Sequence, residues 1–139
     1  MSADPKDVMR RFYGELLTEG KLEVLDEIVS DDYVEHQQIP GRPSGKDAAR
    51  AFVTMFRAAF PDLEVDAQAM VAEGDEVWAY ARMTGTHTGE FMGIAPTGTS
   101  ISYRMMDRVK VRDGMAVEHW GCSDDLGLMT QLGAVPKMG

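Results

Sequence analysis

Apolar residues recur at helical spacing through the first half of the chain. After the Asp4-Pro5 pair, which favours the start of a helix, they stand at Met9, Phe12, Tyr13, Leu16 and Leu17. Gly20 ends this predicted helix, a short second helix follows over residues 22–29, and a third runs over residues 44–60. The pattern therefore predicts a helical first half.

The second half of the chain alternates apolar and polar residues and is punctuated by turn signals, as strands are. A strand-like segment also lies earlier, from Tyr33 to Gln38. Helices followed by antiparallel strands are typical of α+β domains. We therefore predict one α+β domain over residues 1–139, with N-terminal helices packed on a strongly curved, mostly antiparallel sheet. The expected strands span residues 63–73, 76–86, 99–112 and 115–122, and a closing helical turn spans residues 126–132.

The longest predicted strand carries a single charge on its apolar face. That face holds Ile101, Tyr103, Met105, Asp107, Val109 and Val111, and the opposite face holds Ser102, Arg104, Met106, Arg108, Lys110 and Arg112. The second face is mostly cationic, so we expect it to meet solvent or a partner. The apolar face should meet the core, which makes Asp107 a candidate for chemistry.

The turn signal Asp113-Gly114 joins this strand to the last one, and two registers are possible. A two-residue loop would pair apolar residues with charged residues on both faces. A three-residue loop, with Gly114 in the left-handed conformation, would instead place Val109 opposite Val117 and Arg108 opposite Glu118, a favourable cross-strand pair. The hydrophobic pattern therefore predicts the three-residue loop.

This register places Asp107 directly opposite His119 on the apolar face, with Gly121 opposite Met105. A carboxylate beside an imidazole can fix the tautomer of the ring and can transfer protons, especially where the pair is partly buried. The same arrangement is equally compatible with two buried groups that only neutralise each other.

The remaining candidates stand apart from this pair. His36 follows the strand-like segment, and His87 lies in a glycine-flanked loop entry where backbone can approach a ligand closely. Asp124 can cap the closing helical turn or act as an acid/base. No His-x-His or His-x-x-x-His spacing occurs, so we expect no metal site.

The charge balance narrows the class of partner. The formal net charge is −9, from 23 acidic and 14 basic residues that are scattered along the chain. Nucleic-acid binding requires a basic stripe, so we expect no nucleic-acid partner. Eleven methionines fill a core or suit an adaptable apolar pocket.

The single cysteine, Cys122, allows no internal disulfide and fits a reducing compartment. The first six residues contain no apolar segment typical of a signal peptide, and no apolar run approaches the length of about 20 residues that a membrane span needs. We therefore expect a cytoplasmic protein without a membrane partner.

Two segments of the chain resemble a known family. The run from Thr84 to Gly98, TGTHTGEFMGIAPTG, is similar to the G-x-H-x-G-x-x-x-G-x-x-P-T-G segment of SnoaL-like polyketide cyclases, also called predicted ester cyclases. The run from Val111 to Trp120, followed by LGLMTQLG at residues 126–133, resembles the C-terminal signature of that family. The resemblance covers nearly the whole chain.

The resemblance implies a cone-like α+β barrel, shared with ketosteroid isomerase and scytalone dehydratase, that forms dimers or tetramers through its sheet. It implies a cyclase or isomerase acting on a small apolar polycarbonyl or ester. Polyketide members of the family close a ring by intramolecular aldol condensation without a cofactor. A carboxylate removes an acidic proton flanked by carbonyls, and the resulting enolate attacks a second carbonyl.

Matching the family motifs residue by residue places the family's strand histidine at Asp107 and its essential aspartate at Gly121. The resemblance then implies that a proton moves through Asp107, His119 or Asp124. We expect the substrate to contact His36, His87, Tyr33, Tyr103, Met105 and Phe56.

Two other functions remain open on the sequence. Gly121, in place of the family's aspartate, is compatible with a non-catalytic small-molecule-binding protein of the same fold. An epoxide-hydrolase-like enzyme would need an Asp–Arg–Asp arrangement around a water, to which Asp107 with Arg104 or Arg82 offers a partial match.

Overall fold

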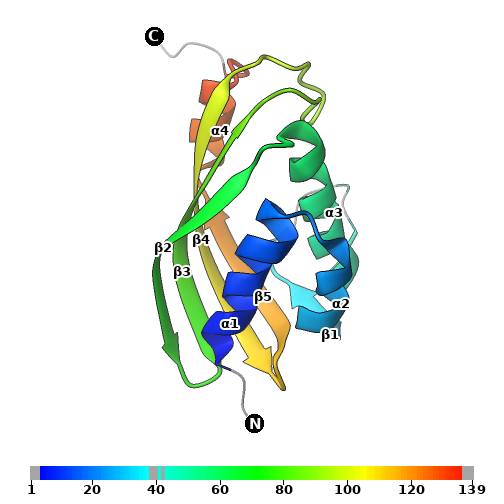
Figure 1. Ribbon diagram of the computed structural model, residues 1–139, viewed down its shortest axis with the longest axis vertical. Helices are drawn as coiled ribbons and strands as arrows, with labels where there is room; N and C mark the ends of the chain where they lie inside the picture. Colours follow the sequence, from blue (N-terminus) through cyan, green and yellow to red (C-terminus); the bar gives the residue numbers. More distant parts are fainter. Residues whose placement is uncertain (1–3, 38–40, 42, 136–139) are drawn as a thin grey trace.

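The computed structural model describes residues 4–37, 41 and 43–135. Its N-terminal half is helical, as the hydrophobic spacing predicts (Figure 1). The Asp4 carboxylate caps the first helix by accepting a hydrogen bond from the Lys6 amide at 3.0 Å. The helical elements are α1 (Pro5–Arg11), its continuation as the π-helix η1 (Phe12–Thr18), the 3₁₀-helix η2 (Leu22–Val24), α2 (Leu25–Ile28), α3 (Gly45–Ala59) and α4 (Asp125–Gln131).

The described residues form one five-stranded sheet in the order β1-β5-β4-β3-β2. All neighbouring strands are antiparallel except β1 and β5, which pair in parallel, so the prediction of a mostly antiparallel sheet is confirmed. The predicted strand at residues 33–38 begins earlier, and Gln38 lies outside the described residues. The strands are β1 (Val29–Glu35), β2 (Glu64–Glu73), β3 (Glu76–Thr86), β4 (Ser100–Arg112) and β5 (Met115–Ser123).

The predicted three-residue loop between β4 and β5 is wrong. Arg112 pairs with Met115, so the loop is the two-residue Asp113-Gly114 turn, with both residues at positive φ, as a type I′ hairpin turn requires. A bulge then leaves Val117 as an extra residue on β5. Without a bulge, the short loop would place apolar residues opposite charged ones; with it, Lys110 stands opposite Glu118, so the mismatch is removed.

The bulge changes which residues stand opposite each other on β4 and β5. Asp107 lies opposite Gly121, and His119 lies opposite Val109, so the predicted direct pairing of Asp107 with His119 is corrected. The predicted pairing of Arg108 with Glu118 is also wrong, because Arg108 lies opposite Trp120. Beyond the bulge the difference from the predicted register is two residues, and side chains alternate with a period of two, so residues from Glu118 onward keep their predicted face. Before the bulge the difference is one residue, so Ala116 points inward in place of Met115.

The helices cover the concave face of the sheet, and the core lies between the two layers (Figure 1). The predicted apolar face of β4 is the buried one: Ile101, Tyr103, Met105, Val109 and Val111 are all buried, and Asp107 is half-buried among them. From the helical layer, Leu16, Leu17, Val53, Phe56 and Phe60 complete this core. The fold is therefore the α+β architecture that the sequence predicts.

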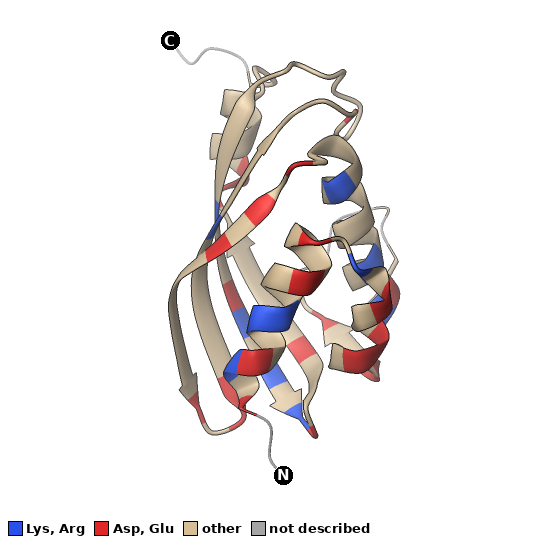
Figure 2. Ribbon diagram, viewed as in Figure 1, with Lys and Arg blue, Asp and Glu red and all other residues tan. Residues whose placement is uncertain are grey.

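Charged side chains lie over the outside of this core. Figure 2 shows lysines and arginines interspersed with more numerous acids along the helices and strands of the described residues. Two basic groups on the outer sheet face form ion pairs: Arg108 with Glu76 at 2.6 Å and Arg104 with Asp124 at 2.8 Å. None of the helices in the described ranges is long and apolar enough to cross a membrane.

Candidate active site

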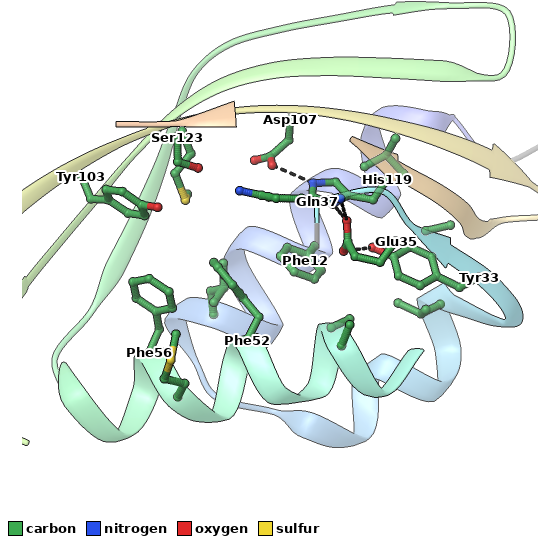
Figure 3. A pocket seen from close by; sticks show the side chains of 18 of the residues that line it. Phe12, Tyr33, Glu35, Gln37, Phe52, Phe56, Tyr103, Asp107, His119 and Ser123 are labelled. Carbon is green, nitrogen blue, oxygen red and sulfur yellow. Dashed lines mark hydrogen bonds and ion pairs between the residues drawn. The ribbon is translucent and has the colours of Figure 1, made fainter. Parts of the chain in front are cut away.

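A cavity of about 400 Å³ lies between α3, the first helix and the concave face of the sheet. Most of the side chains that line it are apolar, and Phe12, Phe52 and Phe56 form much of its helical wall (Figure 3). Most of the polar exceptions come from three adjacent strands of the sheet and the residues that follow them. They include Glu35, Gln37, Asp107, His119, Ser123 and Asp125.

The imidazole of His119 lies between two carboxylates inside this cavity. Its Nε2 is 2.8 Å from Asp107 Oδ1, and its Nδ1 is in hydrogen-bond contact with Glu35 Oε2 (Figure 3). The side chains of all three residues are at most 15% exposed. Three ionisable groups thus form one continuous network on an otherwise apolar wall.

A tyrosine hydroxyl completes each end of the network. Tyr13 donates to Asp107 Oδ2 at 2.6 Å, and Tyr33 donates to Glu35 Oε1 at 2.7 Å. Burial, followed by the neighbouring carboxylate, raises the pKa of each phenol well above its ordinary value. Both hydroxyls therefore stay protonated and act as hydrogen-bond donors to the carboxylates.

The parallel pairing of β1 with β5 positions Glu35 beside His119. The two residues are partners in the ladder, and the His36 amide donates to the His119 carbonyl at 2.9 Å just beyond it. Asp107 reaches the same imidazole from β4, on the other side of β5. The order of strands in the sheet therefore places the histidine between its two carboxylates.

His119 carries a positive charge at neutral pH. Burial by itself lowers the pKa of this imidazole, but its hydrogen bonds to Asp107 and Glu35 and their negative charges outweigh burial and raise the pKa to about 9. An imidazolium beside a carboxylate in a partly closed cavity can exchange a proton with it and with a bound molecule. The network is therefore suited to acid/base chemistry.

A second polar group lies at the other end of the cavity. Tyr103 donates to Asp125 Oδ1, with Ser123 close by (Figure 3). The Phe56 ring stacks on Tyr103, with centroids 5.7 Å apart. Of the side chains predicted to contact substrate, Tyr33, Tyr103, Met105 and Phe56 all line the cavity.

The other predicted site residues lie outside the cavity. His36 is exposed: it stacks on Trp120, with centroids 4.6 Å apart, and pairs with Glu118. His87 is fully buried, and its Nδ1 accepts a hydrogen bond from the Thr97 amide at 3.2 Å, which anchors the loop between β3 and β4. Neither histidine is placed to contact a molecule in the cavity, so these two expectations are corrected.

Asp124 is likewise not part of the cavity wall. Its carboxylate caps α4 by accepting a hydrogen bond from the Gly127 amide at 3.0 Å, and it pairs with Arg104 on the outer face. Of its two interpretations from the sequence, helix capping is the one that this geometry fits. The adjacent Asp125 lines the cavity instead.

Sequence reasoning missed Glu35, Tyr13 and Gln37. Glu35 follows Tyr33 by two positions in a strand, so the alternation that points Tyr33 inward also points Glu35 inward. Tyr13 was counted only as an apolar helix residue, although a buried tyrosine hydroxyl needs a partner.

Comparisons with known proteins agree with this fold. Aklanonic acid methyl ester cyclase DauD of Streptomyces sp. (strain C5) is 28% identical over 131 residues, which cover 91% of this chain and 80% of that protein. The nogalonic acid methyl ester cyclase of Streptomyces nogalater is 28% identical over 116 residues, which cover 82% of this chain and 87% of that protein. The crystal structure of IdmH, a proposed polyketide cyclase from Streptomyces antibioticus, superposes with a TM-score of 0.81 at 34% identity, covering 94% of this chain and 99% of that one. The profile of the SnoaL-like polyketide cyclases matches residues 7–132, and the chain belongs to that family.

Proposed function

We propose that this protein is a cofactor-free acid/base cyclase or isomerase that acts on a small apolar polycarbonyl or ester, within the cavity described above. Membership of a cyclase family and relatives that are named methyl ester cyclases support a ring-closing reaction. The apolar lining of the cavity suits a polyketide with few charges.

The observation that carries the proposal is the Asp107–His119–Glu35 network at the cavity wall. Asp107 is the proposed base: it removes a proton from a carbon flanked by carbonyls and leaves an enolate. The enolate carbon then bonds to a second carbonyl carbon of the same molecule, whose oxygen takes the electron pair. That alkoxide receives a proton from the His119 imidazolium, and the proton held by Asp107 passes to His119 across their hydrogen bond. No atom is gained or lost, so the product is an isomer of the substrate.

Glu35 and Tyr13 are proposed to set up this exchange without touching the reacting carbon. Glu35 holds the imidazole ring in orientation and stabilises its positive charge. Tyr13 fixes the Asp107 carboxylate through Oδ2. The network therefore presents an oriented Asp107 side chain and a protonated His119 imidazole to the substrate.

The test measures ring closure and proton abstraction in one experiment. The purified protein is incubated in D₂O with aklanonic or nogalonic acid methyl ester, and mass spectrometry and NMR follow ring closure and deuterium uptake at the acidic carbon. We expect both in the unaltered protein, and we expect Asp107→Asn to slow both by at least about a hundredfold. Asp66→Asn, an exposed aspartate on β2, is the matched control and should keep full activity. Unchanged rates in Asp107→Asn would reject Asp107 as the base.

A non-catalytic binding protein is the second candidate, and Gly121 is the observation that favours it, because the family's aspartate would stand there. Tight binding of either ester to the unaltered protein without deuterium uptake above the uncatalysed rate would support this alternative. The cavity does not support the third function, an epoxide-hydrolase-like enzyme, which would need an arginine beside Asp107. Among the described residues that line the cavity there is no arginine, and Arg104 lies on the outer face of the sheet.

We further propose that the protein forms a homo-oligomer, a dimer or tetramer, through the outer face of its sheet. Val71, Trp78 and Met106 are 64%, 46% and 55% exposed there, although all three are large and apolar. Val71 pairs with Trp78 across adjacent strands, and Met106 pairs with Tyr80, so the four side chains share one surface. We also propose that the protein is cytoplasmic.

A further inference from the structure

Gly121 faces the cavity directly opposite Asp107, at a point where the backbone does not itself require glycine. A Cβ atom built on Gly121 would lie 2.1 Å from Gln37 Oε1, 3.0 Å from Gln37 Cδ and 2.9 Å from His119 Cε1. The first distance is far below any van der Waals contact. The Gln37 amide therefore occupies the place where a side chain at position 121 would begin.

The approach of Gln37 is fixed by the network itself. Its backbone amide donates to Glu35 Oε2 at 3.1 Å, so the same carboxylate that orients His119 also holds the chain leaving β1. From there the side chain reaches across the cavity, from the His119 side toward Ser123 and below Asp107 (Figure 3). Within the described residues, the amide head of Gln37 makes no hydrogen bond to another protein group, which leaves it available to a ligand.

The charge of the network explains why a neutral donor suits this place. Once Asp107 has taken the proton, the network holds one carboxylate and one imidazolium, and the new negative charge lies on the substrate beside them. A carboxylate at position 121 would repel that charge. An amide adds no charge, and its N–H groups can donate to an oxygen on which negative charge develops.

We propose that Gln37 binds the enolate oxygen of a 1,3-dicarbonyl substrate, and that Gly121 exists to admit it. This inference deepens the proposed function and rests on it. The ligand class is a β-diketone or β-keto ester whose acidic carbon faces Asp107 and whose neighbouring carbonyl oxygen accepts from the Gln37 amide. Gln37 and Gly121 then form one unit, in which a larger residue at 121 displaces the amide.

Two readouts test the proposal. The first is the rate of deuterium uptake at the acidic carbon of aklanonic acid methyl ester. The second is the ultraviolet absorbance of the enolate form of bound 2-acetyl-1-tetralone, an aromatic 1,3-diketone, with its dissociation constant measured by calorimetry. The variants are Gln37→Leu, which keeps the size and removes the donor, Gly121→Ala, and the double variant. Gln68→Leu, an exposed glutamine on β2, is the matched control.

We expect Gln37→Leu to slow deuterium uptake about a hundredfold and to reduce the bound enolate, with a much smaller change in the dissociation constant. Gly121→Ala should cause a comparable loss. In the double variant the losses should not add, because each change removes the same contact. Thermal melting of each variant shows that it is folded.

Full enolate absorbance in a folded Gln37→Leu, or losses that add in the double variant, would overturn the role of Gln37. Failure of the proposed function has a different signature: the unaltered protein would bind the diketone and show no uptake. In that case Gln37 would still be tested by the enolate absorbance, because that signal does not require turnover.

Discussion

His119 Nε2 lies 2.8 Å from Asp107 Oδ1 although the two residues are not opposite each other in the ladder. Val109 stands opposite His119, and Gly121 stands opposite Asp107, so the interacting pair is a diagonal one on a single face. Diagonal neighbours lie within reach of a long side chain such as histidine. The glycine at the fourth corner leaves the space through which Gln37 reaches the cavity.

Removing the imidazole should destabilise the protein. His119→Ala would leave Asp107 and Glu35 buried with no positive charge between them, and breaking a buried ionic group in this way costs about 3–5 kcal/mol. Urea denaturation at pH 7 measures the loss. A His119→Ala variant as stable as the unaltered protein would contradict this account.

The unaltered protein should lose stability in alkali. The pKa of His119 is raised to about 9 in the folded state, against 6.5 as its ordinary value. The folded state therefore binds more protons, so the stabilisation is fully present below about pH 6.5 and is lost as the pH rises through about 9. We expect the free energy of unfolding to fall by up to about 3 kcal/mol across this interval. The His119→Gln variant should show a visibly flatter profile.

The two tyrosines of the network should differ in their effect on turnover. Tyr13→Phe removes the hydrogen bond to Asp107, the proposed base, whereas Tyr33→Phe removes the bond to Glu35. Each loss should cost roughly 1 kcal/mol of stability. We expect Tyr13→Phe to reduce kcat about tenfold with little change in KM, and Tyr33→Phe to reduce it less. A larger kcat effect for Tyr33→Phe would point to Glu35 as the base.

Gly89 should be intolerant of any side chain. A Cβ atom there would lie 2.1 Å from the Ala58 carbonyl oxygen at the end of α3, whereas a Cβ on Gly14 would meet nothing within 4 Å. We expect Gly89→Ala to reduce the free energy of unfolding by about 1–3 kcal/mol. Gly14→Ala, within a helical segment, should increase it by about 0.5–1 kcal/mol. Urea denaturation of both variants compares the two directly.

The outer sheet face should control the oligomeric state. Met106→Lys places a charge in the middle of the exposed apolar surface, and Leu126→Lys makes the same change at an exposed residue of α4. Light scattering coupled to size-exclusion chromatography should show an oligomer for the unaltered protein and for Leu126→Lys, and smaller species for Met106→Lys. An unaltered protein that is monomeric at all concentrations would exclude this interface.

Hydrophobic periodicity was sufficient to predict the element types and most of their bounds. The predicted strand at residues 76–86 is β3 itself, and the face of β4 that contains Asp107 is the inner one. The parallel pairing of β1 with β5 was beyond such reasoning, because it joins segments far apart in the chain and depends on how the intervening elements pack.

Only the part of the site that follows from the alternation of side chains along a strand could be predicted from the sequence. Asp107 and His119 were identified from their shared face, and the error in register did not separate them, since it was an even number of residues. The expectation that Tyr33 and His36 both contact substrate was internally inconsistent, because residues three apart on a strand point to opposite faces. Applying the alternation strictly would have selected Glu35 and rejected His36. His87 lies in a loop, where side chains do not alternate between two faces, so no such pattern predicts its orientation.

The bulge at Val117 has a consequence for how relatives of this protein can be compared. In a hairpin of the same length without the bulge, His119 would stand opposite Arg108 and point to the outer face, while Trp120 would point into the cavity. A related chain that lacks the bulged residue altogether would keep its histidine opposite Val109, on the inner face. The direction of the imidazole therefore depends on the bulge together with the number of residues between the histidine and the Asp113-Gly114 turn. Members that hold this network should have either the bulge or a hairpin shorter by one residue.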